Sequence, residues 1–364
     1  MTSVPTLLHV FPTFGVGGSQ TRFAVLANRL GRRFRHIVVA MDGRTECRER
    51  LEAGLDVSFP RLALRARDTF GNWRRFRALL HSVRPHRLVT YNWGSIECAM
   101  ANWPGMVGHV HIEDGFGPEE AKRQLPRRVL TRRCVLSRST VVLPSRTLFL
   151  LASDIWRLKP AVLRYVPNGV NCRRFGAPGI APYVWDGQGP VIGTVAALRP
   201  EKNIGRLLEA FRLVRSQRPC RLLIAGDGPE RGRLEAQAQR LGITPDVRFA
   251  GHIRGTETIY AALSVLALSS DTEQMPTAVL EAMASGLPVV STDVGDVAEM
   301  VSPANRRFVT PLDVAAMADA LAELVGNPSL ASEIGGANRA KACRDYGEDR
   351  MVAAYEALFG GDGP

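Results

Sequence analysis

Two glutamates, Glu273 and Glu281, are separated by seven residues in the segment EQMPTAVLEAMASG at positions 273–286. A short buried strand, SVLALSS at 264–270, precedes this segment. Pro276 suits the first turn of a helix, since the N–H that it lacks has no use there, and Gly286 suits the left-handed cap at the end. Glu273 then precedes the helix, and Glu281 lies roughly 8 Å further along its axis. The two carboxylates therefore bracket a helix N-terminus.

Such a helix N-terminus suits a diphosphate, because it offers unpaired N–H groups and about half a positive charge. One carboxylate could accept hydrogen bonds from sugar hydroxyls and the other from a ribose. Either glutamate alone would be read as an ordinary acidic residue near a helix. Together with the sequence AMASGLPVV that continues the segment, the pair predicts a site for a nucleotide sugar.

A glycine-rich turn lies near the start of the chain, in FPTFGVGGSQTR. Gly15, Gly17 and Gly18 fall where a strand meets a helix, so the backbone there can approach a ligand and the helix end favours an anion. A tight turn without a ligand is the alternative. The spacing is not GxGxxG, and the second strand, HIVVAMDG, holds Asp42 as its only acid, which argues against a nicotinamide cofactor.

Two histidines occur in the predicted strand VGHVHIEDG. Strand alternation places His109 and His111 on one face, and His111 leads directly into the following loop. A histidine on a strand is often structural, but the carboxyl end of a parallel strand is where ligands bind, which favours a functional His111. Glu113 and Asp114 follow in the loop and could orient the hydroxyl of an acceptor.

The elements that must position these residues alternate between short apolar runs and segments of helical period, which is typical of parallel βαβ units. In the first half we predict strands at 5–11, 35–41, 86–91, 107–112, 139–143 and 162–166, and helices at 18–30, 70–82, 94–102, 120–137 and 145–152. A second series follows with strands in 191–198, 221–228, 247–253 and 287–294, and the chain ends in helical patterns at 313–325, 329–342 and 348–359.

This pattern predicts an α/β protein with two Rossmann-like, doubly wound domains that face each other across a cleft. We expect an N-terminal acceptor-binding domain at 1–170, a Gly- and Pro-rich linker at 171–189, and a C-terminal nucleotide-sugar domain at 190–345. The last helix, about 346–364, is expected to pack back on the first domain.

The composition is that of a folded protein, with 45% hydrophobic and 23% charged residues among 364. The six cysteines are scattered without a CxxC pair, which argues against a zinc site or a disulfide framework and indicates a reducing compartment. MTSVPTLLHVFP lacks a basic leader and is predicted to be a strand, not a signal peptide. With no apolar run of roughly 18 residues, a cytoplasmic protein without a transmembrane helix is expected.

The net charge of +12 is unevenly distributed. Residues 1–170 hold 27 Lys+Arg and 12 Asp+Glu, or +15, whereas residues 171–364 hold 20 and 23, or −3. A one-sided basic field attracts nucleic acid, anionic lipid or an anionic substrate, although a solvated Arg-rich surface would look the same. No nucleic-acid-binding module is recognisable, so nucleic acid is not expected as a partner. RRFRALLHSVR and LPRRVLTRRCVLSR could contact a membrane surface.

The segment at 273–286 resembles the motif of two glutamates separated by seven residues in retaining GT-B glycosyltransferases of the glycosyltransferase 4 family, or glycosyl transferases group 1. Positions in register are Glu273, Pro276, Glu281, Ala282, Gly286 and Pro288, followed by VSTDVGDVAEMV. The resemblance extends over nearly the whole chain, through VPNGV, VAALRPEKNIGRLLEAF, AGDGP and FAGHI. Two positions depart from the family: Gln274 replaces its usual glycine, and Ala197 replaces its usual arginine.

The resemblance implies roles for individual residues. Glu273 would contact hydroxyls of the donor sugar, Glu281 the ribose, and Lys202 the pyrophosphate, while Arg199 could supply the charge absent at Ala197. Catalysis is expected of His111, Glu273 and Lys202, and acceptor binding of Glu113 and Asp114. The expected donor-binding residues are Gly17, Gly18, Arg199, Lys202, Gly226, His252, Ile253, Glu273, Met275, Pro276, Thr277 and Glu281.

The resemblance further implies transfer of a hexose-type sugar from a UDP or GDP sugar, with retention of configuration, in cell-envelope or exopolysaccharide synthesis. The acceptor is expected to be a saccharide or a lipid-linked saccharide, handled by a peripheral protein at the inner face of the cytoplasmic membrane. No cofactor or metal is expected, since the sequence holds no DxD triplet.

Two alternatives remain open. A non-hydrolysing sugar-nucleotide epimerase would need further acid/base carboxylates, which the sequence does not reveal. A degenerate, non-catalytic protein of the same fold would bind only nucleotide or glycan.

Overall fold

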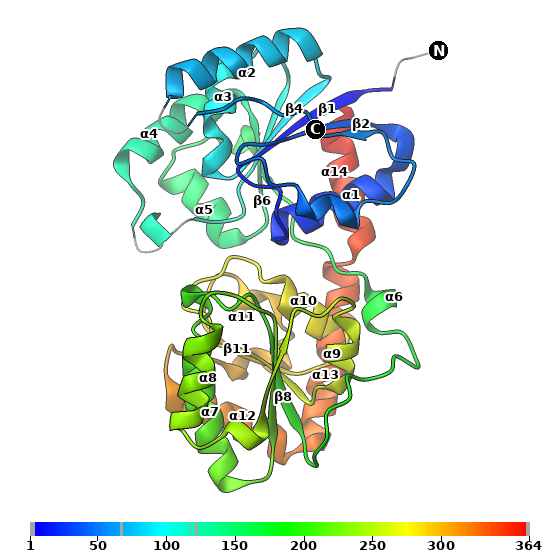
Figure 1. Ribbon diagram of the computed structural model, residues 1–364, viewed down its shortest axis with the longest axis vertical. Helices are drawn as coiled ribbons and strands as arrows, with labels where there is room; N and C mark the ends of the chain where they lie inside the picture. The colour runs from blue at the N-terminus through cyan, green and yellow to red at the C-terminus, as the bar shows by residue number, and fades with distance from the viewer. Residues whose placement is uncertain (1–3, 66–67, 117, 121–122, 362–364) are drawn as a thin grey trace. The chain divides into compact units, whose positions relative to one another are not determined.

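The computed structural model describes residues 4–65, 68–116, 118–120 and 123–361, which form two compact units. The first unit comprises the chain up to Asn168 together with the segment from Asp349 onward. The second unit is Gly169–Glu348. Figure 1 shows the chain passing from the first unit into the second and returning to the first through its last helix.

The first unit is built on a seven-stranded, entirely parallel sheet with the strand order β3-β2-β1-β4-β5-β6-β7. Its strands are β1 (Thr6–Phe11), β2 (Arg35–Ala40), β3 (Val57–Ser58), β4 (Arg87–Tyr91), β5 (His109–Ile112), β6 (Thr140–Leu143) and β7 (Leu163–Tyr165). Its helices are α1 (Gly18–Leu30), α2 (Thr69–Val83), α3 (Ile96–Asn102), α4 (Pro126–Val135), α5 (Arg146–Asp154) and α14 (Glu348–Gly360).

Both faces of this sheet are covered, because side chains of a strand alternate between them. On β1, Leu7 and Phe11 pack with α1 and α14, whereas Leu8 and Val10 pack with α2 and α3. Figure 1 shows α14, the last helix, in the first unit beside α1. The last helix of the chain, α14, therefore packs in the same hydrophobic core as the first strand, β1.

The second unit repeats the plan with six parallel strands in the order β10-β9-β8-β11-β12-β13. Its strands are β8 (Val191–Val195), β9 (Arg221–Ala225), β10 (Val247–Gly251), β11 (Val265–Leu268), β12 (Val289–Thr292) and β13 (Val309–Thr310). Its helices are α6 (Cys172–Phe175), α7 (Ile204–Gln217), α8 (Arg231–Arg240), α9 (Glu257–Ala262), α10 (Thr277–Ala284), α11 (Val297–Met300), α12 (Val314–Gly326) and α13 (Pro328–Asp345).

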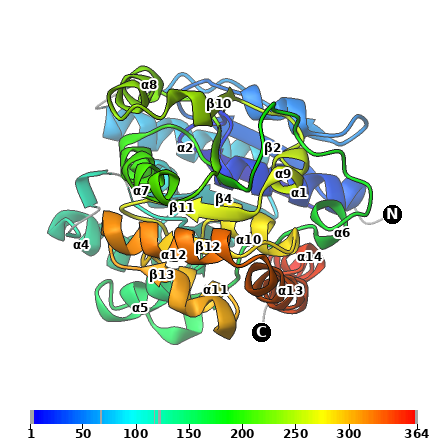
Figure 2. The ribbon, with the colours of Figure 1, turned by 90° about the horizontal axis from the view of Figure 1, so that it is seen from below.

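Two hydrophobic clusters sandwich this second sheet. One joins the strands to α7, α8 and α12, and the other joins them to α9, α10 and α11. Figure 2 shows α7 and α10 on opposite sides of β11. In both sheets the strand order reverses beside the first strand, at β1/β4 and at β8/β11, and in such folds ligands bind at the carboxyl ends of these strands.

The prediction of two Rossmann-like α/β domains is confirmed. The expected helix at 18–30 coincides with α1, and the three terminal helices differ by at most a few residues. Several elements are shorter than expected: the strand at 191–198 ends at Val195, and the helix at 120–137 is reduced to α4, while residues 121–122 lie outside the described part. The predicted linker at 171–189 contains α6, and the short β3, β13 and α11 were not predicted.

Among the described residues, none of the helices combines the length and the apolar character that crossing a bilayer requires.

Three buried histidines make the stability of the first unit depend on pH. Burial lowers the pKa of His36 to about 4 and, with the neighbouring His111, that of His109 to about 3. Burial, with His36 beside it, also lowers the pKa of His9 well below its usual range. The unfolded chain binds protons below pH about 6.5, whereas the folded chain does not. The free energy of unfolding should therefore fall as pH decreases from about 6.5 toward 4, by up to about 1.4 kcal/mol per pH unit for each histidine.

Urea unfolding of the wild type at pH 7.0, 6.0 and 5.0 measures this dependence. His36→Gln should reduce the slope, and His81→Gln, at an exposed position on α2, should leave it unchanged. Equal slopes for the wild type and His36→Gln would contradict the assignment.

Candidate functional site

The glutamate segment lies at the carboxyl end of β11, at the centre of the second sheet. Pro276 caps α10 with extended backbone angles, and the helix begins at Thr277, as the sequence indicates. The helix ends at Ala284, and Gly286 follows with a φ of +76°, which a glycine adopts without strain. Met275, just before the cap, is buried in the core under the loop. Glu273 thus precedes the helix, and Glu281 lies within it.

Glu273 and Lys202 are in direct contact. The Lys202 Nζ donates to Glu273 Oε1 at 2.5 Å, and the Ser270 hydroxyl donates to the same oxygen at 2.8 Å. Lys202 ends a short 3-10 turn, Pro200–Lys202, that follows β8, so the contact joins the ends of β8 and β11. The structure therefore brings together the residues predicted for the sugar and for the pyrophosphate. Ser270 was not predicted to take part.

Glu281 has a partner that the sequence did not reveal. The hydroxyl of Tyr260, on α9, donates to Glu281 Oε2 at 2.8 Å. Tyr260 is almost fully buried, and burial together with the Glu281 carboxylate raises its pKa well above the usual value. The phenol consequently stays protonated and holds one oxygen of the predicted ribose carboxylate in place. Tyr260 resembles any core aromatic in the sequence, so only the fold shows this contact.

The loop that carries Glu273 is supported from behind by the segment after β12. The Asp296 N–H donates to the Gln274 carbonyl at 2.9 Å. A Cβ on Gly295 would lie 2.5 Å from the carbonyl oxygens of both Glu273 and Gln274, and the φ of Gly295 is +56°. Only glycine fits this close approach. The match to VSTDVGDVAEMV therefore has a structural reason, since its glycine lies directly against the loop.

The other donor-binding residues predicted in this unit lie at the ends of neighbouring strands. Gly226 follows β9, and His252 and Ile253 follow β10; His252 is exposed, while Ile253 packs against the core. Arg199 is exposed just before the turn of Lys202, and among the described residues it has no ion-pair partner. Ala197, where the family has arginine, is also exposed.

Gly226 fixes the loop that leads to Lys202. Its φ is +135°, and a Cβ there would lie 1.8 Å from the Ala196 carbonyl oxygen. We expect Gly226→Ala to destabilise the second unit by roughly 1–3 kcal/mol from backbone strain alone, and to displace the loop of Lys202. Gly232→Ala is the matched control, because Gly232 lies in α8 with open space around it, where alanine favours the helix. Urea unfolding should show opposite signs for the two variants; similar stabilities would contradict the proposed constraint.

In the first unit, the glycine turn forms the start of α1. Gly17 is the N-cap residue with extended backbone angles, and the helix begins at Gly18. Neither a side-chain cap nor an acidic residue is present in the first turn. A Cβ on Gly17 would meet the end of the Gln20 side chain at 2.6 Å, and one on Gly18 would meet nothing within 4 Å. The turn is at the carboxyl end of β1, as predicted.

His111 and Glu113 are brought together at the end of β5, and both side chains are fully buried. His111 Nδ1 forms a hydrogen bond of 2.8 Å with Thr90 Oγ1, and His111 Nε2 lies 3.6 Å from Glu113 Oε2. His109 contacts the same Thr90 hydroxyl, so the two histidines share one face as expected. Because neither His111 nor Glu113 reaches the surface of this structure, their predicted contacts with substrates remain predictions.

Asp114 is held by two residues, Arg22 and Asn92. Arg22, on α1, donates to both of its carboxylate oxygens, at 2.6 and 2.8 Å, and also to Asn168 at 2.8 Å. The Asp114 N–H donates to Asn92 Oδ1 at 2.7 Å. This pairing connects the loop after β5 to the last residue before the second unit. Arg22 carries no sequence signal that distinguishes it from the other arginines.

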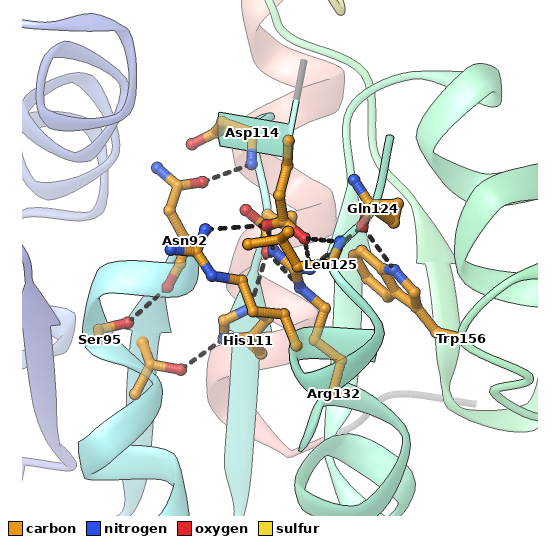
Figure 3. A network of polar contacts seen from close by, with 12 residues as sticks. Asn92, Ser95, His111, Asp114, Gln124, Leu125, Arg132 and Trp156 are labelled. Carbon is orange, nitrogen blue, oxygen red and sulfur yellow. Dashed lines mark hydrogen bonds and ion pairs between the residues drawn. The ribbon is translucent and has the colours of Figure 1, made fainter. Parts of the chain in front are cut away.

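A buried arginine on α4 completes the surroundings of Glu113. Arg132 donates to Glu120 Oε1 and Oε2 at 3.1 and 3.0 Å, and its Nε lies 3.5 Å from Glu113 Oε2. Figure 3 shows Arg132, His111 and Trp156 converging in this network. The Arg132 guanidinium also lies 4.8–5.3 Å from the ring centres of Trp93, Phe116 and Trp156. The basic segment expected to contact a membrane thus contributes one arginine to the interior.

A cavity of about 540 Å³ opens in the first unit beside these loops. Met41, Trp93 and Ile96 are among its apolar lining residues. The Glu97 carboxylate, also in the lining, accepts hydrogen bonds from Thr69 and Asn72, each at 3.0 Å. Apolar walls with a few fixed polar groups are typical of small-molecule sites. The sequence did not indicate this cavity.

Comparison with known proteins agrees with the resemblance. Residues 189–327 match the family described as glycosyl transferases group 1. Over 160 residues the chain is 33% identical to a GDP-mannose-dependent alpha-mannosyltransferase of Mycobacterium tuberculosis. The matched segment covers 42% of this chain and 39% of that protein. The chain thus spans less than half the length of this curated relative.

Two solved structures share the fold over nearly the full chain. A glycosyltransferase from Rickettsia africae has a TM-score of 0.81 at 14% identity and covers 98% of both chains. Anabaena Alr3699/HepE in complex with UDP-glucose has a TM-score of 0.80 at 18% identity and covers 98% of this chain and 99% of that one. The fold class is therefore GT-B.

Proposed function

We propose that the chain transfers a hexose-type sugar from a UDP or GDP sugar to an acceptor, because residues 189–327 match the group 1 glycosyl transferases. The observation that carries the proposal is the set of groups around the start of α10. Glu273 contacts Lys202 before the helix, and Glu281 is fixed by Tyr260 within it. A cation and free helix N–H groups between two carboxylates suit a diphosphate with a sugar on one side and a ribose on the other.

In this proposal the second unit binds the donor. Lys202, Arg199 and the N–H groups at Thr277 stabilise the negative charge that develops on the departing nucleoside diphosphate. Gly226, His252, Ile253 and Met275 shape the nucleotide pocket around them. The relative that uses GDP-mannose and the UDP-glucose complex of the structural neighbour support a nucleotide sugar as donor.

The first unit supplies the acceptor side of the proposal. We place the acceptor saccharide in the cavity lined by Trp93 and Glu97. Asn92, which precedes Trp93, accepts a hydrogen bond from the Asp114 N–H and so connects this cavity to the loop of Glu113 and Asp114. His111 contributes from the end of β5, and the turn at Gly17 and Gly18 offers N–H groups to an anion. Transfer with retention and without a metal follows from the family resemblance and is part of the proposal.

An exposed apolar patch on the first unit supports a lipid-linked acceptor and a position at the inner face of the cytoplasmic membrane. Leu130 on α4 is 62% exposed and Ile155 is 50% exposed, and both line a shallow cavity with Arg123 and Arg133. Apolar side chains flanked by arginines are suited to an anionic lipid surface.

Co-sedimentation with vesicles of phosphatidylglycerol and phosphatidylcholine tests this location. We expect the chain to bind these vesicles, and binding to be weaker at physiological than at low salt. Leu130→Asp should reduce binding at both salt concentrations. Leu150→Asp, a change at an exposed leucine outside the lining of this cavity, is the control. Absence of binding at low salt would indicate an acceptor that is not presented on a membrane.

The transfer itself is tested by incubating the chain with UDP-glucose, UDP-N-acetylglucosamine or GDP-mannose and an alkyl glycoside as a simple acceptor. We expect one donor to release its nucleoside diphosphate in an acceptor-dependent manner, in the presence of EDTA, and NMR of the product to show the anomeric configuration of the donor. Conversion of the donor sugar without acceptor would instead indicate an epimerase. Nucleotide binding without turnover of any donor would indicate a non-catalytic protein.

A further inference from the structure

A continuous hydrogen-bonded chain runs through the first sheet to His111. Ser139 Oγ bonds His109 Nδ1 at 2.7 Å, His109 Nε2 bonds Thr90 Oγ1 at 2.8 Å, and Thr90 Oγ1 bonds His111 Nδ1 at 2.8 Å. All four residues are at least nine-tenths buried. Thr90 on β4 lies directly opposite His111 on β5, so the parallel register itself places the hydroxyl between the two rings. Thr90 and His111 are fully buried, whereas His109 and Ser139 line a cavity of about 300 Å³.

The hydroxyl of Thr90 links the tautomers of the two histidines. It carries a single hydrogen, so it donates to one imidazole and accepts from the other. If His111 carries its proton on Nδ1, Thr90 donates to His109, and His109 donates to Ser139. If the direction is reversed, Ser139 donates to His109, His109 donates to Thr90, and Thr90 donates to His111 Nδ1. In this second arrangement the proton of His111 is on Nε2.

Glu113 selects between the two directions. Its Oε2 lies 3.6 Å from His111 Nε2, and neither of its carboxylate oxygens accepts a hydrogen bond from a described residue. An N–H directed at a buried carboxylate is favourable, whereas a ring lone pair directed at it is repelled. The direction that starts at Ser139 is therefore the stable one. Burial, with His111 beside it, lowers the pKa of His109 to about 3, so His109 remains neutral. A neutral His109 accepts a hydrogen bond at one ring nitrogen and donates one at the other.

We propose that Glu113 holds His111 in the tautomer with its proton on Nε2, and that Thr90 transmits this direction to His109 and Ser139, so that the tautomers of the two histidines are coupled. The consequence for chemistry is that His111 directs an N–H at Glu113 from Nε2 and does not act as a base at that atom. It then supports the Glu113 carboxylate, together with Arg132, and with it the loop that carries Asp114. Any effect of this tautomer on sugar transfer rests on the proposed function, whereas the tautomer of His111 does not depend on it.

Nitrogen-15 NMR of the histidine side chains in the full chain, without substrate, tests the proposal at neutral pH. We expect a pyrrole-type shift for His111 Nε2 and a pyridine-type shift for Nδ1, with the same order at His109. Pyrrole-type shifts at both nitrogens of His111 would mean an imidazolium paired with Glu113 and would overturn the proposal, as would a proton on Nδ1 alone. Because no turnover is needed, this result stands or falls separately from glycosyl transfer.

Variants of Thr90 separate the hydrogen-bonded chain from the effect of Glu113 alone. Thr90→Val, which keeps the shape but removes the hydroxyl, should leave the His111 proton on Nε2, because Glu113 still faces that atom, but should give His109 a mixture of tautomers. Thr90→Ser should restore the single tautomer of His109. If His109 in Thr90→Val keeps the single tautomer of the wild type, Thr90 does not couple the two rings and the proposal is disproved.

Discussion

Replacing Lys202 with methionine is expected to lower kcat for sugar transfer about 10²–10³-fold, the loss typical when one preorganised group that stabilises developing charge is removed. Lys202 is held at the end of β8 by its contact with Glu273, so its ammonium group is already in place when the diphosphate departs. Methionine keeps the length of the side chain but not its charge. Initial rates at saturating donor, with a folded-state check by circular dichroism, measure the effect.

Arg199→Met is the matched variant for this prediction. Arg199 is exposed beside the same turn and has no ion-pair partner among the described residues, so its charge is less fixed. We expect a smaller loss than for Lys202→Met. A large loss for Arg199→Met with normal kcat for Lys202→Met would show that Arg199, and not Lys202, carries the charge for the leaving group.

Replacing Arg132 with methionine is expected to destabilise the first unit by about 3–5 kcal/mol, the range found when one partner of a buried ion pair is removed. The variant would leave Glu120 and Glu113 in the interior without the guanidinium that lies 3.0 Å from one and 3.5 Å from the other. It would also remove the cation between the rings of Trp93, Phe116 and Trp156. Tryptophan fluorescence during urea unfolding follows this region directly.

Arg133→Met is the control on the same helix. Arg133 is exposed, and exposed substitutions usually change stability by no more than about 0.5 kcal/mol. Equal unfolding midpoints for Arg132→Met and Arg133→Met would show that the buried carboxylates are satisfied in another way, through protonation or rearrangement of the loop after β5.

Apart from the short β3 and β13, the sequence was sufficient for the strands of both sheets and for the motif at Glu273–Gly286, because both depend on local periodicity and on special backbone positions such as Pro276 and Gly286. It did not identify Tyr260, Ser270 or Arg132. Their importance comes from contacts with Glu281, Glu273 and Glu113, and apart from Ser270 these contacts join segments about 20 residues or more apart. A core tyrosine and one arginine among many carry no local signal of such a partner.

The two departures from the family can now be placed in the structure. The carbonyl of Gln274 accepts from the Asp296 N–H, which is a backbone contact that any residue can make, so the loop does not need the usual glycine for it. Ala197 is exposed, and its carbonyl accepts from the Arg199 N–H at 2.9 Å, so the two positions belong to one tight turn. An arginine two residues later therefore extends from the same turn.

The central claim is that Glu281 binds the ribose of a nucleotide on the second unit. Isothermal titration of UDP and GDP, each compared with its 2′,3′-dideoxy form, against the wild type and Glu281→Gln tests it most directly. The wild type should bind one of the two nucleotides, and its affinity for the dideoxy form should be about tenfold or more lower, which is the size expected for a hydrogen bond to a charged group. Glu281→Gln should bind both forms equally weakly. A variant that still prefers the ribose form as strongly as the wild type would contradict the account.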